Sequence, residues 1–192
     1  MKADHLPTSG LRRLWAGLWV LLVVLVLAAC STGENQVRFA TDFESGSIGA
    51  VKQLDDDGLS WQLALRDDND DASLPNSFRT WWYLRADRVP VGQSLRMEFT
   101  RLGFPYYFVP VYSYDGTRWQ HFEESEVSLV PGCVIAVPDS CRVVVTKRFD
   151  APTVWIARTF PYTTRDLSAF LAEIVPNPAV RIDTLGLSPV YR

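Results

Sequence analysis

Short runs in which apolar and polar side chains alternate most restrict how this chain can fold. In the run 95–100, apolar residues occupy every second position, so an extended strand would carry them all on one face. The run 61–65 repeats this pattern. An α-helix with one buried face would instead need apolar residues spaced three and four apart. These runs therefore predict β-strands that each bury one face.

Three further runs, 78–86, 142–149 and 153–160, are apolar on both faces. Such runs are typical of central strands, which are covered on both sides. Turn-forming pairs, among them Asp57-Gly58 and Asp115-Gly116, separate the strands at short spacing. Many short strands joined by such turns predict an all-β fold, an antiparallel β-sandwich.

One segment near the C-terminal end has helical spacing instead. Its apolar positions follow the order i, i+3, i+4 and i+7, at Leu167, Phe170, Leu171 and Ile174. Thr163 or Thr164 can cap its start, and Pro176 ends it. We expect one short helix here, lying across one sheet or along an edge of the sandwich.

The first 29 residues differ from the rest in having a long uncharged stretch. Basic residues precede an apolar block, 14–27, that is shorter than the roughly 20 residues of a spanning helix. The block runs into Leu27-Ala28-Ala29-Cys30, which resembles the lipobox of bacterial lipoproteins. The resemblance implies that residues 1–29 are a signal peptide and that Cys30 becomes acylated. The alternative is an uncleaved membrane anchor.

Ser31, which follows the cysteine, resembles the signal for release to the outer membrane. The resemblance implies a protein of the bacterial cell envelope, anchored by lipid in the outer membrane and facing the periplasm. The whole chain has a net charge of -3, and the leader contains more basic than acidic residues, so the remainder is more acidic still. An acidic chain repels nucleic acid and lacks a basic patch for anionic lipid. We therefore expect the acyl chains to make the membrane contact.

Two cysteines remain after Cys30. Cys133 and Cys141 flank a short segment that contains the turn-forming Pro138 and Asp139. In an oxidising compartment a disulfide between them is the favoured interpretation. Structural zinc is the weaker one, because such a site usually takes four ligands.

His121 is the one histidine after the leader, and it limits the possible chemistry. With Glu124 it matches a His-x-x-Glu zinc spacing, but a catalytic zinc needs three protein ligands. The acidic run 67–71 could suggest calcium, although it lacks the glycine and glutamate of an EF-hand, and a solvated turn is favoured. We predict no catalytic residue, no metal ligand and no cofactor in this chain.

The segment 104–112 contains two prolines among many aromatic residues, so it cannot be a single buried strand. Some of its rings should therefore face a partner. The candidate interface residues are Phe104, Tyr106, Tyr107, Phe108 and Tyr112.

The order of several motifs resembles the N-terminal domain of cytosolic-carboxypeptidase-like enzymes of the M14 zinc metallocarboxypeptidase family. The motifs are Asp42-Phe43-Glu44-Ser45-Gly46, Trp81-Trp82-Tyr83-Leu84-Arg85, Pro110-Val111-Tyr112-Ser113 with Trp119, and Pro161-Tyr162-Thr163-Thr164 with Leu167. In that family the domain is an antiparallel β-sandwich packed on the catalytic domain.

The resemblance implies a linker at 30–36, an accessory sandwich at 37–178, and at 179–192 the approach to a peptidase domain that this chain lacks. The implied partner is an M14-like catalytic domain, and zinc is expected only there. The chain would be a fragment or truncated product that shapes access to the catalytic domain. The alternative is a stand-alone envelope lipoprotein that binds a glycan or protein through its exposed aromatic residues.

Overall fold

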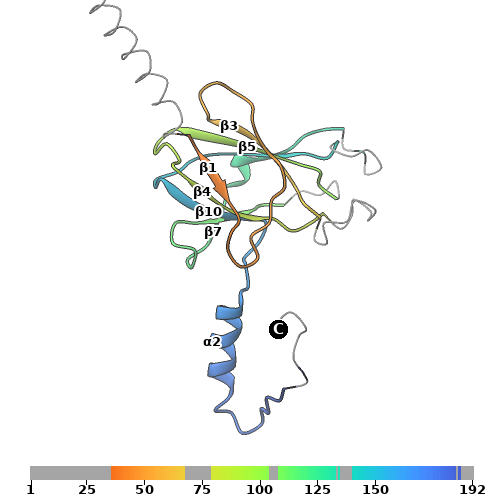
Figure 1. Ribbon diagram of the computed structural model, residues 1–192, viewed down its shortest axis with the longest axis vertical. Helices are drawn as coiled ribbons and strands as arrows, with labels where there is room; N and C mark the ends of the chain where they lie inside the picture. The colour runs from red at the N-terminus through yellow and green to blue at the C-terminus, as the bar shows by residue number, and fades with distance from the viewer. Residues whose placement is uncertain are drawn as a thin grey trace, which may run out of the picture.

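The computed structural model describes residues 36–67, 79–103, 108–132, 134, 140–184 and 186. Figure 1 shows a body of strands with one helix below it. The elements in chain order are β1 (Arg38–Ala40), β2 (Val51–Gln53), β3 (Ser60–Ala64), β4 (Tyr83–Asp87), β5 (Ser94–Thr100), β6 (Val111–Ser113), β7 (Gln120–His121), the 3-10 helix η2 (Glu124–Glu126), β8 (Val127–Leu129), β9 (Val143–Arg148), β10 (Thr153–Ala157) and α2 (Thr164–Ile174).

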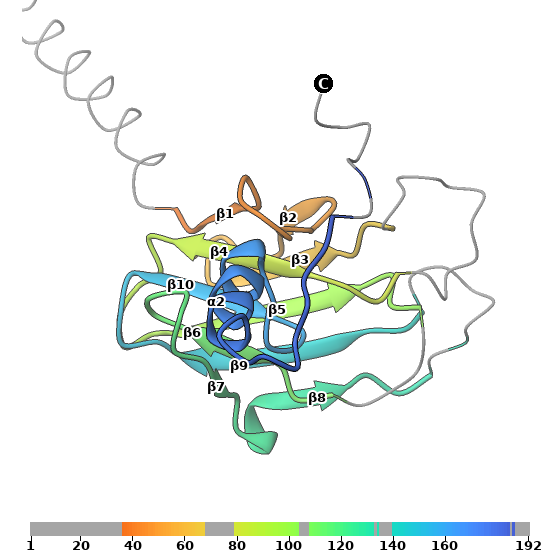
Figure 2. The same ribbon diagram turned by 90° about the horizontal axis from the view of Figure 1, so that it is seen from below.

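The strands form two five-stranded sheets, in the orders β1-β4-β10-β6-β7 and β2-β3-β5-β9-β8. The sheets pack as two layers, which confirms the predicted sandwich (Figure 2). One pairing departs from the antiparallel expectation, because β3 and β5 run parallel, with Trp61 opposite Met97. Parallel neighbours need a crossover connection. Here the chain supplies it by placing β4 in the other sheet.

The core lies between the two sheets. It consists of the apolar residues that face inward from the alternating runs. Leu84, Met97, Phe99 and Ile156 are fully buried there. Trp82 stacks on Phe99, with ring centroids 4.1 Å apart. Burial of such side chains contributes about 1.5 to 3 kcal/mol each and is the main force that holds the sheets together.

The outer face of the β2-β3-β5-β9-β8 sheet carries a buried charge. Glu98 alternates with the core residues of β5 and is only 7% exposed. Arg96 and Arg142 approach its two carboxylate oxygens at 2.9 and 3.0 Å. Burial by itself would raise the pKa of Glu98, but the hydrogen bonds and charges of the two arginines outweigh it and lower the pKa. Glu98 is therefore held ionised between them.

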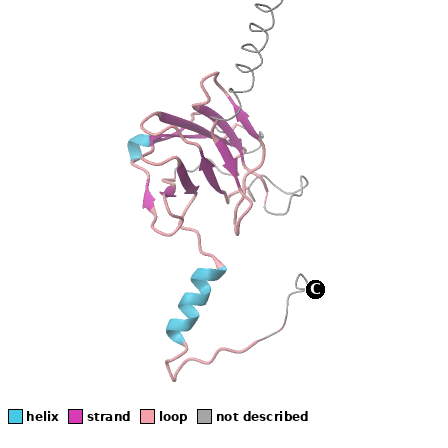
Figure 3. Cartoon of the chain, turned by 60° about the vertical axis from the view of Figure 1, so that its left-hand side comes forward, coloured by secondary structure: helices cyan, strands magenta, loops and turns pink. Residues whose placement is uncertain are grey.

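Helix α2 forms where its spacing predicts. Thr163 is the N-cap and exchanges hydrogen bonds with Asp166 in a capping box. The expectation that α2 lies across the sandwich is wrong, because none of its residues is buried. The segment 158–163 carries the chain beyond the end of the sheets, so the helix projects away from them (Figure 3). In the part of the chain that the structure describes, no helix is long and apolar enough to cross a membrane.

Candidate functional site

The outer face of the β1-β4-β10-β6-β7 sheet carries a second, smaller cluster of apolar side chains. Tyr83, Val111 and Ala157 lie beside one another on neighbouring strands and are buried, although they point away from the main core. Four half-buried aromatic rings cover them: Phe43, Trp81, Trp119 and Trp155. We call these seven residues the aromatic outer cluster.

Tyr83 is the centre of the aromatic outer cluster. Its ring meets Phe43 and Trp119 edge to face, with centroids 4.8 and 5.6 Å away. Trp81 contacts the same ring, and its indole N–H donates to the carbonyl of Ser45 at 2.8 Å. These contacts fix the loop after β1 against the sheet. The rings are thus held in place from both strand and loop.

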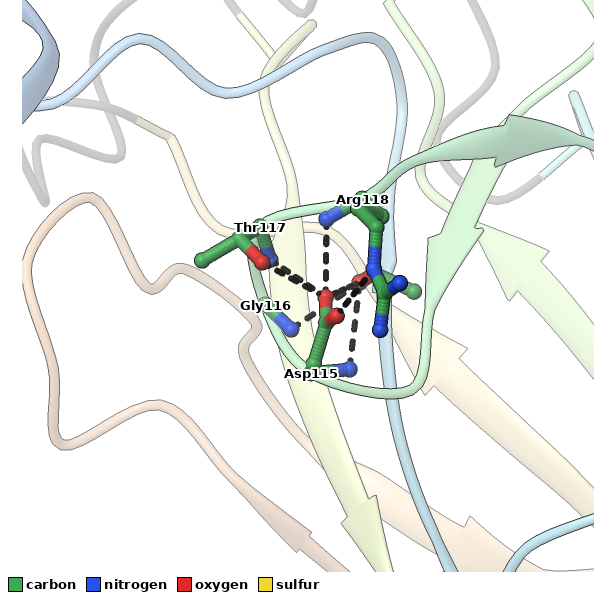
Figure 4. Close-up of polar contacts among 5 residues, drawn as sticks. Asp115, Gly116, Thr117 and Arg118 are labelled. Atoms are coloured by element: carbon green, nitrogen blue, oxygen red, sulfur yellow. Dashed lines mark hydrogen bonds and ion pairs between the residues drawn. The ribbon is translucent and has the colours of Figure 1, made fainter.

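The loop between β6 and β7 forms one rim of this surface. Figure 4 shows the polar contacts within the loop. Asp115 Oδ1 accepts hydrogen bonds from the backbone N–H of Thr117 and of Arg118, at 2.9 and 2.7 Å. Ser113 Oγ accepts from the N–H of Gly116 at 2.9 Å. The backbone hydrogen bonds from Arg118 and then Thr117, followed by their side-chain bonds, hold the pKa of Asp115 far below its usual range. The turn is therefore closed around an ionised carboxylate.

Gly116 allows this loop to lie flat against Trp155. Its φ is +71°, and a Cβ atom there would come within 3.6 Å of the indole ring. A side chain would be strained by the backbone conformation, whereas its Cβ atom would make an ordinary van der Waals contact with the ring. The predicted Asp115-Gly116 turn is thus confirmed, and it also shapes the surface around Trp155.

The first turn of α2 forms the opposite rim. Glu44, on the loop after β1, accepts hydrogen bonds from the N–H of Thr164 at 2.7 Å and from its hydroxyl at 3.0 Å. Hydrogen bonds from Thr163 hold the pKa of Asp166 below its ordinary value. Two causes raise the pKa of Tyr83 in the cluster. The larger is burial, and the smaller is the negative charge of Asp166. The helix start is therefore electrostatically linked to the sheet.

Between the two rims lies a cavity of about 770 Å³. Rings of the aromatic outer cluster line it, together with the exposed Phe160 and Tyr162. Its charged lining residues are Glu44, Asp115, Arg165 and Asp166. This combination of aromatic surfaces and a few polar and charged groups suits the binding of a ligand.

The two residues that suggested metal chemistry lie on different elements. His121 is exposed on β7 and packs edge to face on Phe160, with ring centroids 5.1 Å apart. Glu124 begins η2. A search of the described ranges finds no group of three His, Cys, Asp or Glu residues that could hold a metal ion. The run 67–71 lies outside the described residues, apart from Asp67.

The predicted aromatic interface is partly corrected. Tyr112 is only 7% exposed and belongs to the main core, so the expectation that it faces a partner is wrong. Phe108 is half-buried against the same core. Phe104, Tyr106 and Tyr107 lie outside the described residues. Tyr112 turns inward because it alternates with Val111 on β6, whose side chain belongs to the outer cluster.

The cysteines also fall only partly within the described residues. Cys141 is buried at the start of the segment that leads into β9. Cys133 lies outside the described residues, as does Cys30. The disulfide and the acylation therefore remain predictions.

Trp119 and Trp155 are candidate site residues to which the sequence analysis assigned no binding role. The signal for Trp155 was present, because it alternates with the buried Val154 and Ile156 and must point to the other face of β10. No such pattern marked Glu44 or Asp166, which are far apart in the chain and meet only through the fold.

Comparison with known proteins shows which family has this architecture. The family model for the cytosolic carboxypeptidase N-terminal domain matches residues 39–158. The chain belongs to this family. The match runs from β1 to just after β10, so it spans both sheets and the aromatic outer cluster and ends before α2.

Solved structures agree in fold. A metallo-carboxypeptidase from Burkholderia cenocepacia aligns with a TM-score of 0.59 and 21% identity over 79% of this chain. A candidate carboxypeptidase A from Shewanella denitrificans aligns with a TM-score of 0.59 and 20% identity, also over 79%. The alignment covers only 36% of either relative. No curated protein matched the chain.

Proposed function

We propose that this chain serves as the non-catalytic N-terminal domain of an M14-like zinc carboxypeptidase, where it packs on the catalytic domain and shapes access to its cleft. The observation that carries this proposal is the uncovered apolar face of α2. Leu167, Phe170 and Val175, at the C-cap, are 43%, 49% and 57% exposed. The helix begins a few residues after the matched domain ends.

An isolated helix of this length is only marginally stable in water, and packing of an apolar face is what usually stabilises it. A catalytic domain on the C-terminal side would bury that face. Zinc and the catalytic groups would belong to that domain, and we assign no catalytic role to His121 or Glu124. The alternative binding role through the segment 104–112 loses support, because Tyr112 lies in the core.

The gene offers the first test. Coding sequence beyond the codon for Arg192 should contain a His-x-x-Glu motif and a distant histidine. A stop codon there would instead favour a stand-alone envelope lipoprotein.

The helix offers the second test, in the complete protein. Replacing both Leu167 and Phe170 by Ser should lower the midpoint of thermal unfolding of the peptidase and reduce its release of C-terminal residues. Glu173→Ser is the matched control, since Glu173 is exposed on the same helix without an apolar side chain. Equal effects of the control and the double variant would contradict packing through this face.

We also propose that acyl chains on Cys30 anchor the protein to the outer membrane on its periplasmic side. Cys30→Ala should release the protein into a soluble fraction or leave the precursor uncleaved. A variant that fractionates and migrates like the parent would contradict the anchor.

We further propose that Cys133 and Cys141 form a disulfide, which in the chain-entropy model contributes roughly 2 to 3 kcal/mol. Peptide mapping without reductant should recover the two peptides linked. Free alkylation of both thiols would refute the bond.

A further inference from the structure

The cavity between the aromatic outer cluster and the first turn of α2 has a lining that selects for one kind of ligand. We propose that it binds a basic side chain, the guanidinium group of arginine or the ammonium group of lysine, presented by a peptide. This inference goes beyond the accessory role and does not depend on it, because every group involved belongs to the sandwich, to the connecting segment 158–163 or to the start of α2.

The first argument comes from the aromatic walls. Trp119 and Trp155 are half-buried, so each is fixed by the fold and still presents part of its surface. Phe160 and Tyr162 are 51% and 62% exposed on the other side of the cavity. The face of an aromatic ring carries negative potential and attracts a cation, most strongly on tryptophan. Several rings around one cavity favour a cation with a flat or compact head.

The second argument concerns the direction of the hydroxyl protons. Thr117 Oγ1 donates to Asp115 at 2.8 Å, and Thr163 Oγ1 donates to Asp166 at 2.6 Å. Both threonines line the cavity, and their protons are used by the protein's own carboxylates. Thr163 Oγ1 also accepts from the N–H of Asp166 at 3.4 Å, so the hydroxyl oxygens can offer a ligand only their remaining lone pairs. Arginine and lysine side chains are donors without an acceptor, so they complement such a surface.

The third argument is charge. Three carboxylates line the cavity, on Glu44, Asp115 and Asp166, and Arg165 is the one basic residue among its described lining groups. Asp115 is already paired with Arg118, at 2.7 Å, and Arg165 offsets part of the charge of Asp166, so Glu44 and the remaining charge of Asp166 supply the negative potential. The ring faces and these carboxylates therefore attract the same sign of charge.

The start of α2 does not reverse this preference. A helix N-terminus usually attracts anions through its free N–H groups. Here the N–H of Thr163 donates to Asp166 at 2.8 Å, and that of Thr164 donates to Glu44 at 2.7 Å. The protein's own carboxylates already occupy the place that an external anion would take.

The test is a titration of the full chain, held in mild detergent, with the peptide acetyl-Gly-Arg-Gly-amide. The indole N–H resonances of Trp119 and Trp155 should shift and saturate, while that of Trp61 in the main core should not. The same peptide with citrulline has nearly the same shape without the charge. It should bind at least about fivefold more weakly, as expected for the loss of a cation–aromatic contact.

Variants locate the site. Glu44→Gln keeps an acceptor for Thr164 but removes the charge, and should weaken binding about threefold to fivefold. Arg165→Gln should tighten binding. Asp56→Asn, an exposed carboxylate on the turn after β2, is the matched control and should bind as the parent does. Trp119→Ala should weaken binding, and unchanged dispersion of the remaining resonances will show that it is folded.

Equal binding of the arginine and citrulline peptides would overturn the proposal. So would saturable shifts of Trp155 that keep the parent's affinity in both Glu44→Gln and Trp119→Ala. Inorganic phosphate shifting these resonances in place of the arginine peptide would show an anion site and would equally refute it.

Discussion

The main core of the sandwich and helix α2 contain the same kinds of side chain in opposite surroundings. Leu84 and Phe99 are fully buried between the sheets, whereas Leu167 and Phe170 are 43% and 49% exposed. The sheets bury their own apolar faces, so the sandwich is complete without the helix. Helix α2 is amphipathic and capped, yet the described part of the chain buries none of its residues. The sandwich thus buries its own apolar surface, whereas helix α2 depends on a partner to bury its apolar face.

The strongest test of this difference is to remove a large side chain from the main core. Phe99→Ala should lower the free energy of unfolding by about 3 to 5 kcal/mol, because it removes a buried ring and the stack with Trp82. Denaturant unfolding followed by tryptophan fluorescence measures the loss. A decrease below about 1 kcal/mol would mean that the sheets do not depend on this core.

The buried charge of the outer face should give a smaller effect that depends on pH. The pKa of Glu98 is lowered in the folded state, so its contribution is fully present above the unfolded pKa of about 4.3 and is lost as the pH falls through the folded pKa. Glu98→Gln should cost about 1 to 2 kcal/mol at neutral pH, since Arg96 and Arg142 keep partial contact with water.

The measurement for Glu98 is urea unfolding of parent and variant across the acid range. The gap between their stabilities should shrink at acid pH, below the folded pKa of Glu98. A gap of constant size would assign the loss to packing and not to charge.

The cap of α2 should affect the helix alone. Thr163→Ala removes one side of the capping box and should cost the helix about 0.5 to 1 kcal/mol. We expect a weaker helical circular dichroism signal with an unchanged thermal midpoint of the sandwich. A joint decrease of both would show that the two parts fold as one unit.

The smallest effect is expected on the exposed face of α2. Phe170→Ser should change the free energy of unfolding of this chain by less than about 0.5 kcal/mol, because the ring is 49% exposed and belongs to neither apolar cluster of the sandwich. Calorimetry of the two chains side by side measures it. A loss as large as that of Phe99→Ala would erase the distinction between the two regions.

Sequence reasoning located most elements because their signals are local. Period-two alternation placed β3 and β5, and the spacing from Leu167 to Ile174 placed α2. Their partners were not predictable in the same way, because nothing local tells a helix which surface it meets. The parallel pairing of β3 with β5 and the meeting of Glu44 with Thr164 likewise arise from tertiary arrangement. Tyr112 was misassigned because the whole run 104–112 was treated as one surface.

The position of β4 in its sheet has a consequence for how the chain reaches this structure. Asp87 pairs with Arg38 on one side and with Thr153 on the other. Strand β4 therefore lies between β1 and β10, the first and last strands of the sandwich in chain order. Pairings between such distant positions close large loops and slow the search for the native state. During synthesis β4 emerges long before β10, so one edge of β4 stays unpaired until β10 has been made. The sandwich therefore cannot be finished until its last strand is made, and a nascent chain stopped before Thr153 leaves β4 open to pairing with other chains.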